Sequence, residues 1–107
     1  MNIVYSTSYE NANKKLTEIA NEKKGDIIRS RGSIEVKTDS EVWKWVNPQT
    51  PIARAYKSTV AIIDRGCSIG DLHYVILPAL VGDANNITFF HYSKRWSGAD
   101  DAPIEIV

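Results

Sequence analysis

Hydrophobic and polar positions repeat with the period of a helix in the first part of this chain. Residues 2–5 form a short apolar run that is typical of a strand. After it, apolar side chains recur every three or four positions, which predicts a helix with a left-handed stop at Gly25. Thr7, with Glu10 three positions later, matches a capping box at the start of this helix. Its predicted buried face consists of Tyr9, Ala12, Leu16, Ile19 and Ala20.

A period of two replaces the helical period after Gly25. Residues 26–31 and 33–37 predict two strands separated by Gly32. Residues 41–46 are rich in strand-forming side chains, and we expect them to pair back as a hairpin.

The second half of the chain begins with a break at Pro48 and Pro51. Residues 52–57 fit either a short helical turn or an extended lead-in, and the pattern does not separate the two. Residues 59–63 carry β-branched side chains at both odd and even positions, which is typical of a central strand buried on both faces.

A second helix and a further strand follow. Ser68 and Asp71 form the pattern of a helix cap, and a helical stripe extends from there to Leu80. Pro78 is expected to kink this helix or end it early. Residues 87–92 predict a strand.

The last segment is an irregular polar tail at residues 93–103, followed by a candidate edge strand at 104–107. Taken together, the elements predict one α/β domain over residues 1–107. We expect a mixed sheet of about five to seven strands covered by two helices. The length of 107 residues suits a single core of this kind.

The net charge of the chain bears on whether its binding partner is a nucleic acid. Thirteen basic residues balance thirteen acidic ones, so net charge does not support nucleic-acid binding, although a local patch remains compatible with it. Arg29 and Arg31 share a strand face, and we expect Glu35 and Glu41 on adjoining strands to neutralise them.

Cysteine content and hydropathy indicate the cellular compartment and whether the chain associates with a membrane. The single Cys67 excludes an internal disulfide and a cysteine-based zinc cluster. One cysteine and the lack of a signal-peptide pattern favour the cytoplasm. No apolar run approaches the roughly 20 residues that span a bilayer, so no membrane association is expected.

The predicted central strand ends in an acid, Asp64. A carboxylate at such a strand tip holds Mg²⁺ in Walker B elements. This acidic strand end, the order of the predicted elements and the basic lead-in at residues 54–57 are shared with another class of protein. In these features the chain resembles part of the ATPase domain of phage large terminases and related helicase-like P-loop proteins. The resemblance covers residues 3–93 and implies a phage or mobile-element origin, with Asp64 at a nucleotide site.

Two parts of that family's site are missing from the sequence. There is no Gly-x-x-x-x-Gly-Lys-Ser/Thr loop to hold phosphates, and Arg65 follows Asp64 where the family usually has an acid. We therefore expect no independent ATP hydrolysis, and a degenerate nucleotide- or nucleic-acid-binding domain would need the phosphate loop of another chain. The alternative that we favour is structural: Asp64 caps a turn or pairs with Arg65 or Lys57.

The segment Gly66–Gly70 satisfies the Gly-x-Ser-x-Gly pattern of a nucleophile elbow. Ser68 would be the nucleophile of a small hydrolase, with His91 or His73 as base and Asp64 or Asp83 orienting it. The competing interpretation, which we favour, makes Ser68 an ordinary helix cap.

Cys67 is a second candidate nucleophile, since a helix N-terminus lowers the pKa of a thiol. His73 and His91, with Asp71 or Asp83, fit a two-histidine metal site. For these residues, too, the structural or solvated interpretation is favoured, so we expect no metal and no cofactor.

Aromatic side chains provide the third candidate, a binding surface. Trp43 and Trp45 lie two positions apart and share one strand face, whereas Lys44 points to the other. Both indoles fit either the core beneath the first helix or an exposed contact surface. The candidate binding residues are Trp43, Trp45, Tyr56, Arg95 and Trp96.

These observations favour a small non-enzymatic binding protein that acts through a protein partner or a homodimer. A hydrolase that uses Ser68 or Cys67 with His91 is the first alternative. A degenerate nucleotide- or nucleic-acid-binding domain is the second.

Overall fold

The computed structural model describes residues 1–81, 86–91 and 104–106. These residues form an α/β domain, which confirms the predicted fold class. Its seven-stranded mixed sheet has the order β2-β3-β4-β1-β5-β6-β7. The strands are β1 (Asn2–Tyr5), β2 (Asp26–Ser30), β3 (Ser33–Lys37), β4 (Val42–Val46), β5 (Val60–Asp64), β6 (Ile87–His91) and β7 (Ile104–Ile106).

Parallel strands occupy the middle of the sheet and antiparallel strands its two edges. The strands β4, β1, β5 and β6 run parallel to their neighbours. On one side β3 and β2 add an antiparallel extension, and on the other β7 pairs antiparallel with β6. The predicted hairpin and the predicted final edge strand are both confirmed.

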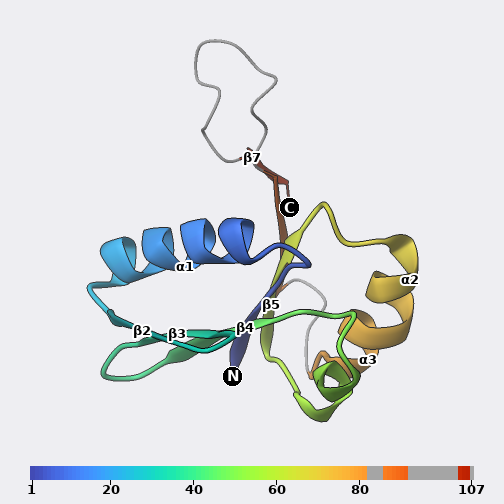
Figure 1. Cartoon of the computed structure of the whole chain (residues 1–107), viewed down its shortest axis with the longest axis horizontal. Helices are drawn as coiled ribbons and strands as arrows, with labels where there is room; N and C mark the ends of the chain where they lie inside the picture. Colours follow the sequence, from blue (N-terminus) through green and yellow to red (C-terminus); the bar gives the residue numbers. More distant parts are fainter. Residues whose placement is uncertain (82–85, 92–103, 107) are drawn as a thin grey trace.

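The helix α1 (Tyr9–Lys23) covers one face of the sheet, over the strands from β2 to β1 (Figure 1). Its apolar face buries Ala12 and Leu16 completely, together with Val4 of β1. The predicted amphipathic helix is therefore confirmed, and its packing forms the first of two cores.

Both ends of α1 differ in detail from the prediction. The N-cap is Ser8 rather than Thr7, because the Ser8 hydroxyl accepts a hydrogen bond from the Asn11 N–H at 3.3 Å. At the other end Lys24 takes the left-handed conformation, with φ of 54°. Gly25 serves close packing instead, since a Cβ there would lie 2.8 Å from Cγ1 of Val36.

A second, interrupted helix covers the opposite face. It consists of α2 (Ile69–Asp71), a π-helical turn η2 (Leu72–Ile76) and α3 (Leu77–Ala79). It ends one residue after Pro78, which confirms the expected early stop. The short 3₁₀ helix η1 (Pro51–Ala55) precedes β5, so residues 52–55 form a helical turn, whereas Tyr56 after it is extended.

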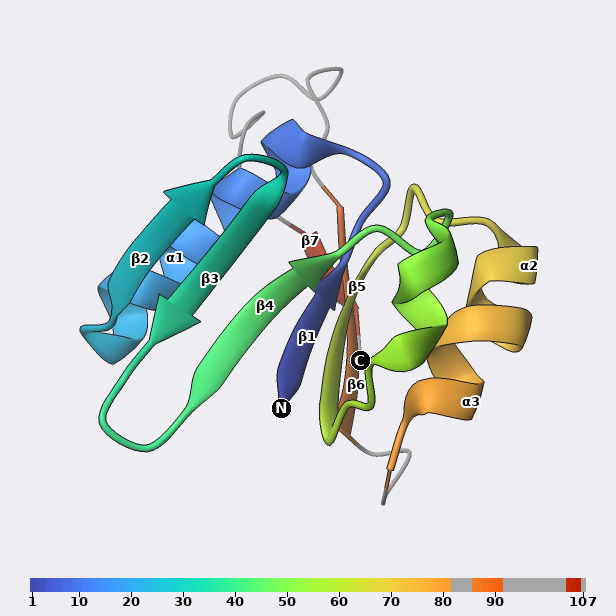
Figure 2. The ribbon, with the colours of Figure 1, turned by 60° about the horizontal axis from the view of Figure 1, so that its bottom comes forward.

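The helices of this second face leave part of the sheet uncovered. Their core contains residues of β1, β5 and β6 but only Val46 from β4. Figure 2 shows η1, α2 and α3 on one side of the domain and the strands β2, β3 and β4 on the other. Of these three strands, only β4 therefore reaches the core beneath these helices, through Val46.

The expected pairing of Arg29 with a glutamate on an adjoining strand is wrong, and Arg31 lies in the turn after β2 rather than on the strand. Arg29 donates hydrogen bonds to Asn13 and Thr17 of α1, at 2.7 and 3.1 Å. Glu35 lies opposite Ile28 and approaches Lys44 at 3.7 Å instead. The register places Glu35 and Arg29 on opposite faces, because neighbouring strand positions alternate.

Candidate functional site

Two regions of the molecule contain most of the described residues that the sequence singled out. The first is the junction from Asp64 to Asp71, where β5 leads into α2. The chain leaves β1 toward the face of α1 and leaves the neighbouring strand β5 toward the face of α2 (Figure 1). Such a change of direction at the carboxyl ends of parallel strands is where open α/β sheets bind ligands.

Asp64 is only 2% exposed and is held by three donors. Its Oδ2 accepts hydrogen bonds from the Ser6 hydroxyl at 2.7 Å and from the Asn11 amide at 3.0 Å. Its Oδ1 accepts the Gly66 N–H at 2.9 Å. The carboxylate thus joins the β1–α1 loop, the start of α1 and its own turn, which matches the favoured turn-capping role. No ion pair with Arg65 or Lys57 occurs among the described residues.

Ser68 forms a reciprocal capping box with Asp71. The Ser68 hydroxyl accepts the Asp71 N–H, and the Asp71 carboxylate accepts the Ser68 N–H, both at 3.0 Å. The serine is exposed, and no hydrogen bond joins it to a histidine within residues 1–81 and 86–91. This geometry is that of a helix start.

Cys67 has the opposite character from a reactive thiol. Burial, with the charges of Asp64 and Asp71, raises the pKa of its thiol to about 12. Its sulfur lies 3.8 Å from the carbonyl oxygen of Tyr5. Burial and two nearby carboxylates thus act against the lowering by a helix N-terminus that a nucleophilic Cys67 would need, in line with the favoured structural interpretation.

The histidines do not complete either candidate site. His73 is exposed on η2, His91 lies at the end of β6, and Asp83 lies outside the described residues. Among the described residues, no three His, Cys, Asp or Glu side chains form a metal-binding group.

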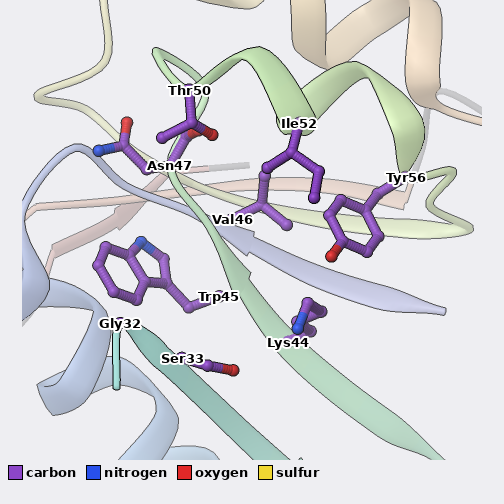
Figure 3. Close-up of a pocket in the computed structure, with 9 residues that line it drawn as sticks. All are labelled: Gly32, Ser33, Lys44, Trp45, Val46, Asn47, Thr50, Ile52 and Tyr56. Atoms are coloured by element: carbon purple, nitrogen blue, oxygen red, sulfur yellow. The ribbon is translucent and has the colours of Figure 1, made fainter. Parts of the chain in front are cut away.

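The second region is an open pocket of about 270 Å³ beside the end of β4 (Figure 3). The pairing of β3 with β4 ends at Lys44, whereas β4 stays paired with β1 through Val46. The two strands therefore separate and leave a gap that side chains line. These residues are Gly32, Ser33, Lys44, Trp45, Val46, Asn47, Thr50, Ile52 and Tyr56.

Trp45 is fixed in this pocket by its polar atom and by its ring. Its Nε1 donates a hydrogen bond to the Ser6 carbonyl at 2.9 Å, and the Tyr9 ring packs edge-on with its centroid 5.6 Å away. The indole remains partly exposed. A rigid aromatic surface of this kind offers contact area at little cost in conformational entropy.

The opposite side of the pocket comes from η1 and the residue after it. Ile52 is 60% exposed, and Tyr56 is partly buried against the second core. The ammonium group of Lys44 lies 5.4 Å from the centroid of the Tyr56 ring. Figure 3 shows Ile52 and Tyr56 on the helical side of the pocket and Trp45 on the strand side.

The five candidate binding residues therefore separate into three groups. Trp43 and Trp45 share the α1 face as expected, but Trp43 is 4% exposed and belongs to the core. Trp45 and Tyr56 line the pocket. Arg95 and Trp96 lie outside the described residues.

Sequence reasoning missed several residues of both regions. Ile52 is the one large aliphatic side chain in residues 52–57, and this is a signal that the sequence contains. Ser6 and Asn11 bind Asp64 from 58 and 53 residues away, and no sequence pattern indicated this contact.

Comparisons with known proteins identified no relative of this chain. No family model, curated protein or solved structure matches the chain. None of the helices in the described part of the chain has the length and apolarity that crossing a bilayer requires.

Proposed function

We propose that this protein is a non-enzymatic binding domain that engages a partner protein through the pocket between Trp45 and Tyr56. The observation that carries the proposal is the pair of aromatic side chains, with the 60% exposed Ile52, around an open pocket. Protein interfaces are built around such aromatic and aliphatic anchors.

The hydrolase alternative has less support. Ser68 is engaged in a capping box, and the thiol of Cys67 keeps its proton at neutral pH. Asp64, the residue that would hold Mg²⁺ in the nucleotide alternative, is buried with three donors on its carboxylate. Groups in these positions stabilise the chain around them, which favours binding over catalysis.

The occupant of the pocket is an apolar side chain on a partner protein. Trp45, Val46, Ile52 and Tyr56 offer mostly apolar surface, and the lining contains no carboxylate. We also propose that the protein is cytoplasmic and of phage or mobile-element origin. The free Cys67 fits a reducing compartment, and the proposed origin rests on the resemblance of the sequence to terminase ATPase domains alone.

Selection from a random peptide display library on the wild-type protein tests this function. We expect enriched peptides to share an aromatic or large aliphatic anchor. The affinity of a synthetic, labelled peptide is then measured by fluorescence anisotropy. Tyr56→Ala should weaken binding by about tenfold or more, because an interface anchor contributes at least that much.

Tyr74→Ala is the matched control, since Tyr74 is 71% exposed on η2 and lies outside the pocket lining. It should bind the peptide like the wild type. Failure of any peptide to enrich, or equal loss of affinity in both variants, would overturn the proposal. Light scattering of the unliganded protein distinguishes a second copy of the chain from a different partner.

A further inference from the structure

A second cavity, of about 400 Å³, opens beside the junction on the face of α2. It lies where β5 and β6 end and where α2 begins. This volume falls in the range of small-molecule sites, and the position is the carboxyl edge of the parallel strands. The aromatic pocket is separate from it, since the two share no lining residue.

The floor of the cavity is apolar. Ile63 is 1% exposed, and Leu72 and Phe89 are partly buried against the same core. Ile69 also lines the cavity and is 75% exposed. If the hydrocarbon part of a ligand covers this exposed isoleucine, the burial of apolar surface lowers the free energy of binding.

One basic side chain, that of Arg65, lines the cavity at the end of β5. Ile63 pairs with Phe89 in the β5–β6 register, and the N–H of Arg65 donates to the carbonyl of Phe90 at 2.8 Å. The next position of this register brings the backbone of Arg65 beside that of His91, which is not among the residues that line the cavity.

Arg65 is the cation that is free for a ligand. Its side chain is exposed, lines the cavity and has no hydrogen bond or ion pair with the described residues. The two nearby acids have internal donors: Asp64 accepts three hydrogen bonds, and Asp71 accepts the Ser68 N–H. Guanidinium groups bind carboxylates in bidentate geometry, which adds direction to the attraction.

We propose that this cavity binds a small amphipathic carboxylate. Its hydrocarbon body lies on Ile63, Leu72 and Phe89 under cover of Ile69, and its carboxylate pairs with Arg65. The site is independent of the aromatic pocket and of the protein partner that we assign to it.

Octanoate, octylammonium and octanol are the probes, because they share one chain and differ in the charge of the head group. Each is titrated into the ¹⁵N-labelled full-length protein, and amide shifts are followed by NMR. We expect octanoate to shift the amides from Arg65 to Leu72 and that of Phe89. Octanol should bind more weakly than octanoate, and octylammonium more weakly still.

Arg65→Gln should weaken octanoate binding by about tenfold, the loss of one charge-assisted contact. Lys57→Gln removes the same charge from an exposed position ahead of the opposite end of β5 and should leave the affinity unchanged. Ile69→Ser should weaken octanoate and octanol alike. Because Ile69 and Arg65 are exposed, both variants are expected to fold.

Equal affinity for the three probes would show an apolar patch without an anion site and would overturn the proposal. Unchanged octanoate binding in Arg65→Gln, or shifts confined to other parts of the chain, would overturn it too. Tyr56→Ala should bind octanoate like the wild type. Failure of the cavity proposal is therefore distinguishable from failure of the proposed function of the aromatic pocket.

Discussion

The junction and the aromatic pocket differ in what their side chains already do. At the junction, residues with catalytic chemistry are occupied: Asp64 by three donors and Ser68 by a capping box. At the pocket, Trp45 and Ile52 have the chemistry of a core but remain partly or largely exposed. The chemical type of a residue is thus a weaker guide to function than whether its groups are already engaged.

The two neighbouring tryptophans provide the largest expected contrast. Trp43→Ala removes an indole that is 4% exposed and should lower the free energy of unfolding by about 3–5 kcal/mol. Trp45→Ala removes a partly exposed indole and should cost about half as much. Urea denaturation of both variants measures this difference. Equal losses would mean that Trp45 is a core residue, which would remove it from the proposed binding surface.

The Asp64 carboxylate should matter for folding rather than for a reaction. Asp64→Ala leaves Ser6, Asn11 and the Gly66 N–H without their acceptor and should cost about 3 kcal/mol, since unpaired buried donors are penalised. Asp64→Asn keeps one acceptor oxygen and should cost less. The midpoint of chemical denaturation reports both values. A stable Asp64→Ala variant would show that the carboxylate is not needed for structure.

The capping box predicts a smaller effect at Ser68. Ser68→Ala should lower stability by about 1 kcal/mol, the usual contribution of an N-cap hydroxyl. Ser8→Ala, at the cap of α1, is the matched control and should behave similarly. Thermal unfolding measures both. Loss of a hydrolytic activity in Ser68→Ala with unchanged stability would support the hydrolase instead.

The raised pKa of Cys67 predicts slow alkylation with a defined pH dependence. With a pKa of about 12, the folded protein holds its proton, and the reactive thiolate should increase about tenfold per pH unit between pH 8 and 11. The rate of iodoacetamide labelling, followed by mass spectrometry, gives this profile, and urea-unfolded protein is the control. A plateau below pH 9 in the folded state would indicate an activated cysteine.

Local patterns predicted most of the fold. The stripe of apolar residues on α1 and the β-branched run of β5 place each element near its observed bounds, because these signals lie within a single element. The exact caps were less accessible: Thr7 and Ser8 both carry a hydroxyl, and only the backbone geometry decides between them.

The candidate sites depended on information that a single sequence does not contain. Two of the three donors to Asp64 come from residues more than 50 positions away, and the pocket exists because β3 stops pairing with β4 at Lys44. Strand parity predicted that Trp43 and Trp45 share a face. Their different exposure follows from where the β3–β4 ladder ends, between the two tryptophans, which no local pattern encodes.

The affinity of one selected peptide for two variants, Ile52→Asp and Ser68→Ala, tests the central claim most directly. Ile52 is 60% exposed, so its replacement should leave the fold intact while placing a charge in the pocket. Ile52→Asp should weaken binding by about tenfold or more, and Ser68→Ala should leave it unchanged. Full binding by Ile52→Asp together with loss of binding by Ser68→Ala would contradict the account and assign the function to the junction.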